Sequence, residues 1–229
     1  MADAKKAMVN ILMDMSGRFP PNVIFDDWIK CLAIAIQNSC VKVTDEVFSD
    51  REEQYRAVIS KYDSDIEDIF SQMTALLGFA LDEKTEDVLG IVYMEASMGN
   101  KNAGQFFTPS GISAIKAKIT ASQIAKGLKK NNKKNYRLYE PTSGSGGIIM
   151  EIVRELQKRG IDYSRHICVT AQDLDWRCVY MTYIQLSLLD INAVVAQGDC
   201  IEEPFEEGNE YPAHRLFITP KRMERLKHD

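Results

Sequence analysis

The chain has 229 residues, 45% of them apolar and 27% charged, which suits a globular protein with one core and a helical appendage. Its net charge of −5 excludes a generally basic nucleic-acid binder but leaves room for a local basic patch. No stretch has the apolar length of a membrane span or a signal peptide, and the five cysteines form no Cys-x-x-Cys pair. We therefore expect a cytoplasmic protein with reduced thiols, no metal site and no membrane partner.

Residues 1–98 are predicted to form a helical domain. Apolar residues at helical spacing indicate three helices, over residues 22–37, 66–81 and 86–98. Capping-box patterns at Ser49-x-x-Glu52 and Ser64-x-x-Glu67 each stand ahead of a periodic segment. These two patterns predict helix starts.

Residues 99–229 show strand-like and helix-like segments in alternation. After a linker at 99–104, apolar runs indicate strands over 137–139, 167–171, 193–196 and 216–219. Helical patterns alternate with them, over 111–128, 148–159 and 175–189. Such alternation implies an α/β fold with a parallel sheet covered on both faces. Ligands of these sheets bind beyond the carboxyl ends of the strands.

A glycine-rich turn, Gly144-Ser-Gly-Gly147, follows the first predicted strand and opens a predicted helix. Glycines permit a tight turn and a close approach of the backbone to a ligand, and the free N–H groups of a helix start attract negative charge. The turn is neither the Gly-x-Gly-x-x-Gly fingerprint nor a P-loop. Taken alone it is a weak indication of a binding site.

Aspartates follow the next two predicted strands, at Asp173 and Asp199. Asp173 could accept hydrogen bonds from ribose hydroxyls, and Asp199 could accept one from an exocyclic amine such as that of adenine. Either aspartate alone is more ordinarily a helix cap or a turn residue. Because three motifs stand at successive strand ends, together they favour a nucleoside site.

The chain resembles the modification subunit of type I restriction-modification systems, a family of adenine-specific DNA methyltransferases, in four motifs: Gly104-Gln-Phe-Phe-Thr-Pro109, Tyr139-Glu-Pro-Thr-Ser-Gly-Ser-Gly-Gly147, Ala171-Gln-Asp173 and Gly198-Asp199. The segment Asp87-Val-Leu-Gly-Ile-Val-Tyr93 is similar to the family's junction between a helical domain and the catalytic core. The resemblance implies a Rossmann-like class I methyltransferase core over 99–229, behind the helical domain 1–98. The sequence ends at Asp229, where the family continues through further strands, so we expect a truncated sheet.

The resemblance also implies S-adenosylmethionine as the cofactor. Its methionine end would contact Phe107, Thr108 and Pro109. Its amino-acid and ribose parts would be held by Glu140, Thr142, Ser143, Gly144, Ser145 and Gly146. Asp173 would bind the ribose hydroxyls and Asp199 the adenine amine. Asp173 stands where the family has a longer glutamate, so the ribose contact is expected to be longer or water-mediated.

The family's catalytic tetrapeptide, Asn/Asp-Pro-Pro-Tyr/Phe after the fourth strand, does not occur in the sequence. Its positional counterpart is Thr219-Pro-Lys-Arg222, which makes Thr219 and Pro220 a degenerate catalytic motif. Threonine lacks the planar amide oxygen that accepts from the adenine amine, although Arg222 could stack on a flipped base.

Three functions therefore stay open. The chain could methylate adenine N6 in DNA, with a partner chain completing the core. It could instead be a catalytically silent cofactor- or DNA-binding relative that acts as an interaction or regulatory subunit. A small-molecule methyltransferase or nucleotide-binding protein is the third class, and the family-like segment 104–109 argues against it. The family layout also implies that the helical domain contacts a second copy or a partner subunit.

A lysine-rich segment precedes the first predicted strand. Residues 110–139 contain no acidic side chain, and the lysines predicted to bind DNA are Lys129, Lys130, Lys133 and Lys134. They either complement the dipole at the end of a solvated helix or form a phosphate-contacting strip near the cofactor cleft.

Overall fold

The structure is a computed structural model that describes residues 3–17, 19–42, 44–97, 110–130, 135–206, 208 and 210–227. Its contacts divide the chain into two compact units, Met1–Lys84 with Val88–Gln105 and Thr85–Asp87 with Phe106–Asp229. We call these the helical unit and the sheet unit. The predicted boundary between residues 98 and 99 and the predicted linker at 99–104 lie outside the described residues. Among the residues that are described, no helix combines the length and apolar character needed to cross a membrane.

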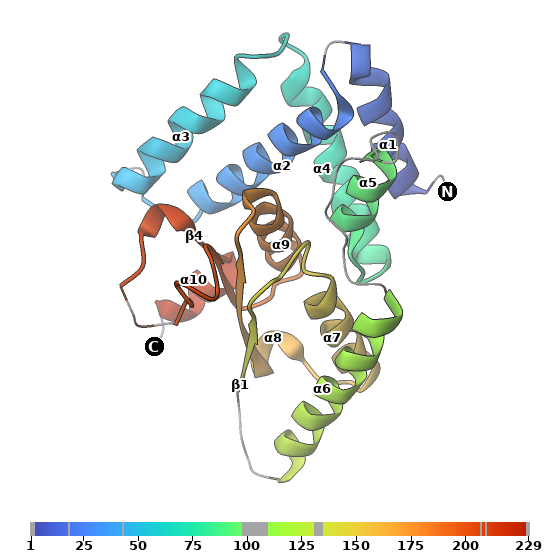
Figure 1. The fold of residues 1–229 in the computed structure, drawn as a ribbon, viewed down its shortest axis with the longest axis vertical. Helices are drawn as coiled ribbons and strands as arrows, with labels where there is room; N and C mark the ends of the chain where they lie inside the picture. The colour runs from blue at the N-terminus through green and yellow to red at the C-terminus, as the bar shows by residue number, and fades with distance from the viewer. Residues whose placement is uncertain are drawn as a thin grey trace. The chain divides into compact units, whose positions relative to one another are not determined.

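The described part of the helical unit contains α1 (Ala4–Asp14), a 3₁₀ turn (Met15–Gly17), α2 (Pro21–Asn38), α3 (Glu46–Ile59), α4 (Ile66–Glu83) and α5 (Val88–Ser97) (Figure 1). Helix α1 packs on α4 and α5, and α2 packs on α3 and α5. Met8, Leu12, Trp28 and Met73 are completely buried in the resulting core. The three predicted helices correspond to α2, α4 and α5, and are confirmed.

Of the two predicted helix starts, the first is wrong, and the second is correct in position but not in its cap. Helix α3 begins at Glu46 because the Asp45 carboxylate accepts from the backbone N–H of Val47 at 3.0 Å, so Ser49 lies inside the helix. Helix α4 begins at Ile66 after Asp65, with no side-chain hydrogen bond at the cap, and Ser64 lies one residue earlier. An earlier aspartate therefore takes the capping position at α3, and at α4 the capping box does not form.

The sheet unit is built on four strands, β1 (Tyr136–Glu140), β2 (Ile167–Asp173), β3 (Ala193–Gln197) and β4 (Leu216–Ile218), in the order β1-β2-β3-β4. The first three are parallel, but β4 runs antiparallel to β3. The expectation of a wholly parallel sheet is therefore wrong for β4. Parallel neighbours need a crossover, usually a helix. In the described part of 198–215 only a 3₁₀ turn, Ala213–Arg215, is helical, so the chain returns antiparallel.

The helices of the sheet unit are α6 (Ser110–Lys130), α7 (Gly147–Lys158), α8 (Tyr163–His166), α9 (Trp176–Leu188) and α10 (Pro220–Leu226) (Figure 1). Helix α6 packs along α7, and α9 packs on β2 and β3. The crossovers through α7 and α9 step the same way across the sheet, so right-handed connections place both helices on one face. These elements confirm the predicted α/β class and a core that holds β1, β2 and β3 side by side.

The two faces of β3 are covered differently. On the α9 face, Tyr183 packs against Phe217 of β4 with ring centroids 4.9 Å apart. On the other face, Val194 and Ala196 are buried against Phe205, which belongs to the segment between β3 and β4. The sheet is therefore covered on both faces at β3, as predicted, by α9 on one face and by this connecting segment on the other.

Candidate functional site

The loop between β1 and α7 needs glycine at two positions. Gly144 and Gly146 have φ angles of 55° and 91°, which L side chains rarely adopt. The Gly146 N–H donates to the carbonyl of Ser143 at 2.8 Å and closes the turn. A Cβ atom at Gly146 would lie 3.2 Å from the hydroxyl of Thr182, so space and backbone conformation exclude larger residues together.

Asp173, at the end of β2, fastens this loop to the sheet. Its carboxylate accepts from the N–H of Gly144 at 2.8 Å and from the N–H of Asp175 at 3.0 Å. Burial raises the pKa of Asp173, and these backbone hydrogen bonds oppose the rise. A carboxylate has about four lone-pair sites, so both oxygens retain capacity for ligand hydroxyls. The predicted ribose contact of Asp173 stays a prediction.

A second carboxylate, that of Asp87, also holds the glycine loop. It accepts hydrogen bonds from the Ser145 hydroxyl and from the Gln185 side-chain amide, the latter at 3.0 Å. The same amide donates to the Ser145 carbonyl at 2.8 Å. Sequence reasoning missed this role because Asp87 is separated from Ser145 and Gln185 by 58 and 98 residues. No local sequence pattern indicates a hydrogen-bond partner so far away along the chain.

The ends of β2 and β3 are joined by a network of buried polar groups. The fully buried Gln172 amide accepts from the Tyr139 hydroxyl at 3.0 Å and from the Phe205 N–H at 2.9 Å. The Gly198 N–H donates to the Asp173 carbonyl at 2.9 Å. A Cβ atom at Gly198 would lie 2.2 Å from the hydroxyl oxygen of Tyr211, so any side chain there would have to displace that hydroxyl.

Asp199 acts first as a turn residue. Its Oδ1 atom accepts from the N–H of Ile201 at 2.8 Å and more weakly from that of Glu202 at 3.4 Å. The predicted contact between Asp199 and adenine stays a prediction. Beside these polar groups two large apolar side chains face solvent, Leu174 after β2 at 65% exposure and Ile201 after β3 at 87%. Apolar surface next to a few fixed polar groups suits a flat aromatic ligand.

Glu140 ends β1 at the same edge of the sheet. Burial raises the pKa of its carboxyl group, while the Lys116 charge and the Thr142 N–H pull that pKa down. Ser143 and Ser145 are buried inside the loop, and Thr142 is exposed. The structure therefore brings the predicted residues of the glycine loop together with the two aspartates, listed in order as Glu140, Thr142, Ser143, Gly144, Ser145, Gly146, Asp173 and Asp199. Phe107, Thr108 and Pro109 lie outside the described residues.

The degenerate catalytic motif lies elsewhere. Because β4 is antiparallel, its last residue pairs near the beginning of β3, at the edge opposite the glycine loop. Thr219 is completely buried there, and its hydroxyl donates to the Ile191 carbonyl at 2.7 Å and accepts from the Ala193 N–H at 3.0 Å. Thr219 caps α10 and Pro220 is the first residue of that helix. The structure therefore does not bring these two residues of the degenerate motif to the glycine loop.

The lysine strip is also not beside the loop. Lys129 and Lys130 end α6, and β1 begins a few residues later, so these lysines lie where the strands begin (Figure 1). The structure therefore does not bring Lys129 and Lys130 to the glycine loop. Lys133 and Lys134 lie outside the described residues.

Comparison with known proteins places this site in a family. A model of the N-6 DNA methylase family matches residues 84–219. The chain is similar to the methyltransferase subunit of a type I restriction-modification system from Streptococcus thermophilus, with 13% identity, a TM-score of 0.46, and coverage of 91% of this chain and 60% of that one. It is also similar to a putative class I S-adenosylmethionine-dependent methyltransferase from Listeria monocytogenes, with 13% identity, a TM-score of 0.45, and coverage of 87% and 54%.

The chain thus spans 60% and 54% of the lengths of these two structures. No curated protein matches it. The family match covers more than half of the chain and includes the glycine loop, Asp87, Asp173 and Asp199. This chain belongs to the N-6 DNA methylase family.

Proposed function

We propose that this chain binds S-adenosylmethionine at the carboxyl ends of β1, β2 and β3, and serves the N6 methylation of adenine in DNA. The observation that carries the proposal is the glycine loop fastened to the end of β2 by Asp173, in a chain of the N-6 DNA methylase family. The bound cofactor supplies a methyl group on a positively charged sulfonium. The remaining work of binding falls to residues of the sheet unit.

These residues fit the parts of the cofactor. The left-handed glycines let the loop backbone approach the ligand closely. Ionised Glu140 attracts the amino group of the methionine part, and Asp173 offers its spare lone pairs to the ribose hydroxyls. Asp199 holds its turn through Oδ1, which leaves Oδ2 for the adenine amine. Leu174 and Ile201 supply apolar surface for the base.

Calorimetry with S-adenosylmethionine and its demethylated product tests this proposal on the reduced, folded chain. Saturable binding is expected, with Gly144→Asp abolishing it through a charged side chain in the tightest part of the loop. Asp199→Asn keeps an oxygen for the turn but adds an N–H donor that opposes the adenine amine, so it should weaken binding. Asp82→Asn, at an exposed position of α4, is the matched control and should bind the cofactor as the wild type does. A folded chain without saturable binding would overturn the proposal.

A second candidate is a silent relative that binds the cofactor and acts as an interaction or regulatory subunit. Two observations favour it: the sequence lacks Asn/Asp-Pro-Pro-Tyr/Phe, and Thr219 is buried at the opposite edge of the sheet. In this proposal the helical unit supplies the contact with a second copy or with a partner subunit.

Transfer of a labelled methyl group to DNA separates the two candidates. The assay is run with the chain alone and with candidate partner subunits, and Gly144→Asp is the negative control. Transfer by the chain alone, lost on Asp199→Asn, would establish an enzyme and contradict the silent relative. Cofactor binding without transfer in any combination would favour the silent relative.

A further inference from the structure

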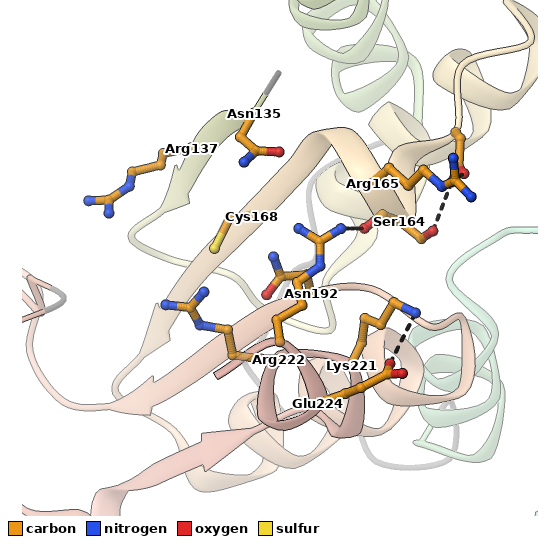
Figure 2. A pocket seen from close by; sticks show the side chains of 11 residues that line it. Asn135, Arg137, Ser164, Arg165, Cys168, Asn192, Lys221, Arg222 and Glu224 are labelled. Atoms are coloured by element: carbon orange, nitrogen blue, oxygen red, sulfur yellow. Dashed lines mark hydrogen bonds and ion pairs between the residues drawn. The ribbon is translucent and has the colours of Figure 1, made fainter. Parts of the chain in front are cut away.

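A basic pocket lies where the parallel strands begin, at the edge opposite the glycine loop. It has a volume of about 730 Å³. Five cationic side chains line it, namely Arg137, Arg165, Lys221, Arg222 and Arg225, against two carboxylates, Asp162 and Glu224, a balance of 5 − 2 = +3. In Figure 2, Arg137 and Arg165 lie on opposite sides of this space, with Asn192 and Arg222 between them. Positive charge is therefore concentrated at this pocket, although the chain as a whole has a net charge of −5.

The floor of the pocket is a row of residues across three strands. Arg137 and Cys168 are register partners on β1 and β2. The Val169 N–H donates to the Asn192 carbonyl at 2.8 Å, which carries the pairing on to the start of β3. Arg137, Cys168 and Asn192 therefore share one face of the sheet. Helix α10 brings Arg222 to this face, as Figure 2 shows.

Asn192 is the residue whose unsatisfied hydrogen bonding indicates a ligand in this pocket. Its side chain lines the pocket, and only 2% of the residue is exposed. Its side-chain oxygen is buried and accepts no hydrogen bond from the residues that the structure describes. Buried polar atoms are rarely left in this condition without a reason such as a bound ion or ligand. An asparagine amide can turn to present its NH₂ group, which donates to an anion.

The charges around Asn192 are positioned by their neighbours. Lys221 is held by Asp190 and Glu224, both at 3.2 Å, and these partners raise its pKa, so it stays protonated. Arg225 donates to the Ser164 carbonyl at 2.5 Å, a partner that carries no charge of its own. With Asp190 included the balance is 5 − 3 = +2. Several guanidinium groups around one space match the oxygens of a phosphate.

We propose that this pocket binds a phosphate group, carried either by the backbone of a nucleic acid or by a small phosphorylated ligand. The proposal is independent of cofactor binding, because its residues lie at the other edge of the sheet from the glycine loop. Lys129 and Lys130 end α6 at the same edge of the sheet, where the strands begin (Figure 1).

The test uses the whole chain and two probes. Inorganic pyrophosphate is titrated by calorimetry, and a fluorescent DNA duplex is titrated by anisotropy, each at low and at moderate salt. We expect saturable pyrophosphate binding that weakens about tenfold or more in the double variant Arg137→Gln/Arg222→Gln. Asn192→Asp, which places a negative charge in the pocket at almost unchanged size, should have a similar effect. Exposed Arg56→Gln/Arg159→Gln removes the same charge elsewhere and should change neither titration by more than about twofold.

The two sources of phosphate give different outcomes. Pyrophosphate that displaces the DNA, with both affinities lost in the pocket variants, identifies a nucleic-acid backbone. Pyrophosphate binding that is lost in these variants while DNA binding is unchanged identifies a small phosphorylated ligand. Absence of saturable pyrophosphate binding, or variants that bind it as the wild type does, would overturn the proposal. Thermal unfolding and cofactor titration of each variant show that it is folded, and the exposed single variant Arg137→Gln keeps the test valid if Arg222→Gln unfolds.

Discussion

At the carboxyl ends of the parallel strands, carboxylates surround the glycine loop, whereas at the amino ends guanidinium groups surround an open pocket. Asp173 and Asp87 accept hydrogen bonds from the loop itself, so they fix its shape. The cations of the basic pocket leave a net positive charge around space that a ligand can enter. One edge of the sheet therefore carries a loop fixed by hydrogen bonds, and the other carries a pocket lined mainly by cations. Variants of the glycine loop should change ligand binding mainly by altering the geometry of the loop. Variants of the basic pocket should change ligand binding by an amount that depends on salt.

The largest effect is expected for Gly146→Val. The φ angle of 91° is strained for any side chain, and the new Cβ would meet the Thr182 hydroxyl at 3.2 Å. We expect the free energy of unfolding to fall by about 1–3 kcal/mol. Cofactor affinity should fall by roughly 100-fold or more, about 2.8 kcal/mol, because the loop can no longer keep its shape. Calorimetry and thermal unfolding measure the two effects.

Gly160→Val is the matched control for this variant. Gly160 also has a positive φ angle, 66°, but a Cβ atom there would meet nothing within 4 Å. It should lose stability through the backbone alone and keep the cofactor affinity of the wild type. Equal losses of affinity in both variants would mean that general destabilisation, and not the shape of the loop, explains the effect.

The next largest effect is expected at the Asp87 network, which tests whether this carboxylate positions the loop. Asp87→Ala and Ser145→Ala each break the hydrogen bond between the two side chains. In a double-mutant cycle, we expect a coupling energy of about 1–3 kcal/mol in the free energy of unfolding. Cofactor affinity should fall about tenfold in each single variant, and Asp87→Glu should recover part of it. Additive energies in the cycle would show that the two residues act separately.

Local signals explain why most of the fold could be predicted from the sequence. Apolar runs and helical periodicity are properties of neighbouring residues, so the strand predicted over 193–196 is β3 (Ala193–Gln197) to within one residue. The direction of β4 could not be predicted in this way, because a three-residue apolar run reads alike in both directions. Its pairing depends on the connection that precedes it.

Two features are not predicted correctly from the sequence: the role of Asp87, which depends on long-range contacts, and the helix start at residues 219–220. Asp87 belongs to the site through partners far away in the sequence, so no motif indicated it. The threonine and proline at 219–220 carried the ordinary pattern of a helix start, a capping residue followed by proline. The same residues also stand at the position of the family's catalytic motif after the fourth strand. The helix α10 (Pro220–Leu226) was therefore absent from the prediction.

A smaller effect is expected when Lys129, Lys130, Lys133 and Lys134 are all replaced by alanine. If they contact phosphates, the slope of log affinity for DNA against log salt should flatten by up to about one per lysine. Cofactor affinity should not change, because Lys129 and Lys130 lie at the opposite edge of the sheet from the glycine loop. The slope is measured by anisotropy over a range of salt concentrations. An unchanged slope would leave these lysines as ordinary surface residues.

The smallest effect is expected for Glu140→Gln, measured as stability against pH. Burial raises the pKa of Glu140 above its ordinary value of 4.5, so the folded chain holds this proton more tightly than the unfolded chain does. The wild type should therefore lose stability as pH rises from 4.5 through the raised pKa, and the loss should be complete above it. Glutamine carries no charge, so the stability difference between the variant and the wild type should grow over this window.

Chemical denaturation at several pH values measures that difference, and the Asp173 contribution largely cancels because both proteins contain it. The same variant should bind the cofactor more weakly, since it lacks the charge proposed to attract the methionine amino group. Gained stability together with lost affinity would show that the buried charge is retained for binding at a cost to folding. A difference independent of pH would mean that the charge of Glu140 does not lower the stability of the folded chain. The proposed carboxylate contacts at the glycine loop would then rest on the aspartates alone.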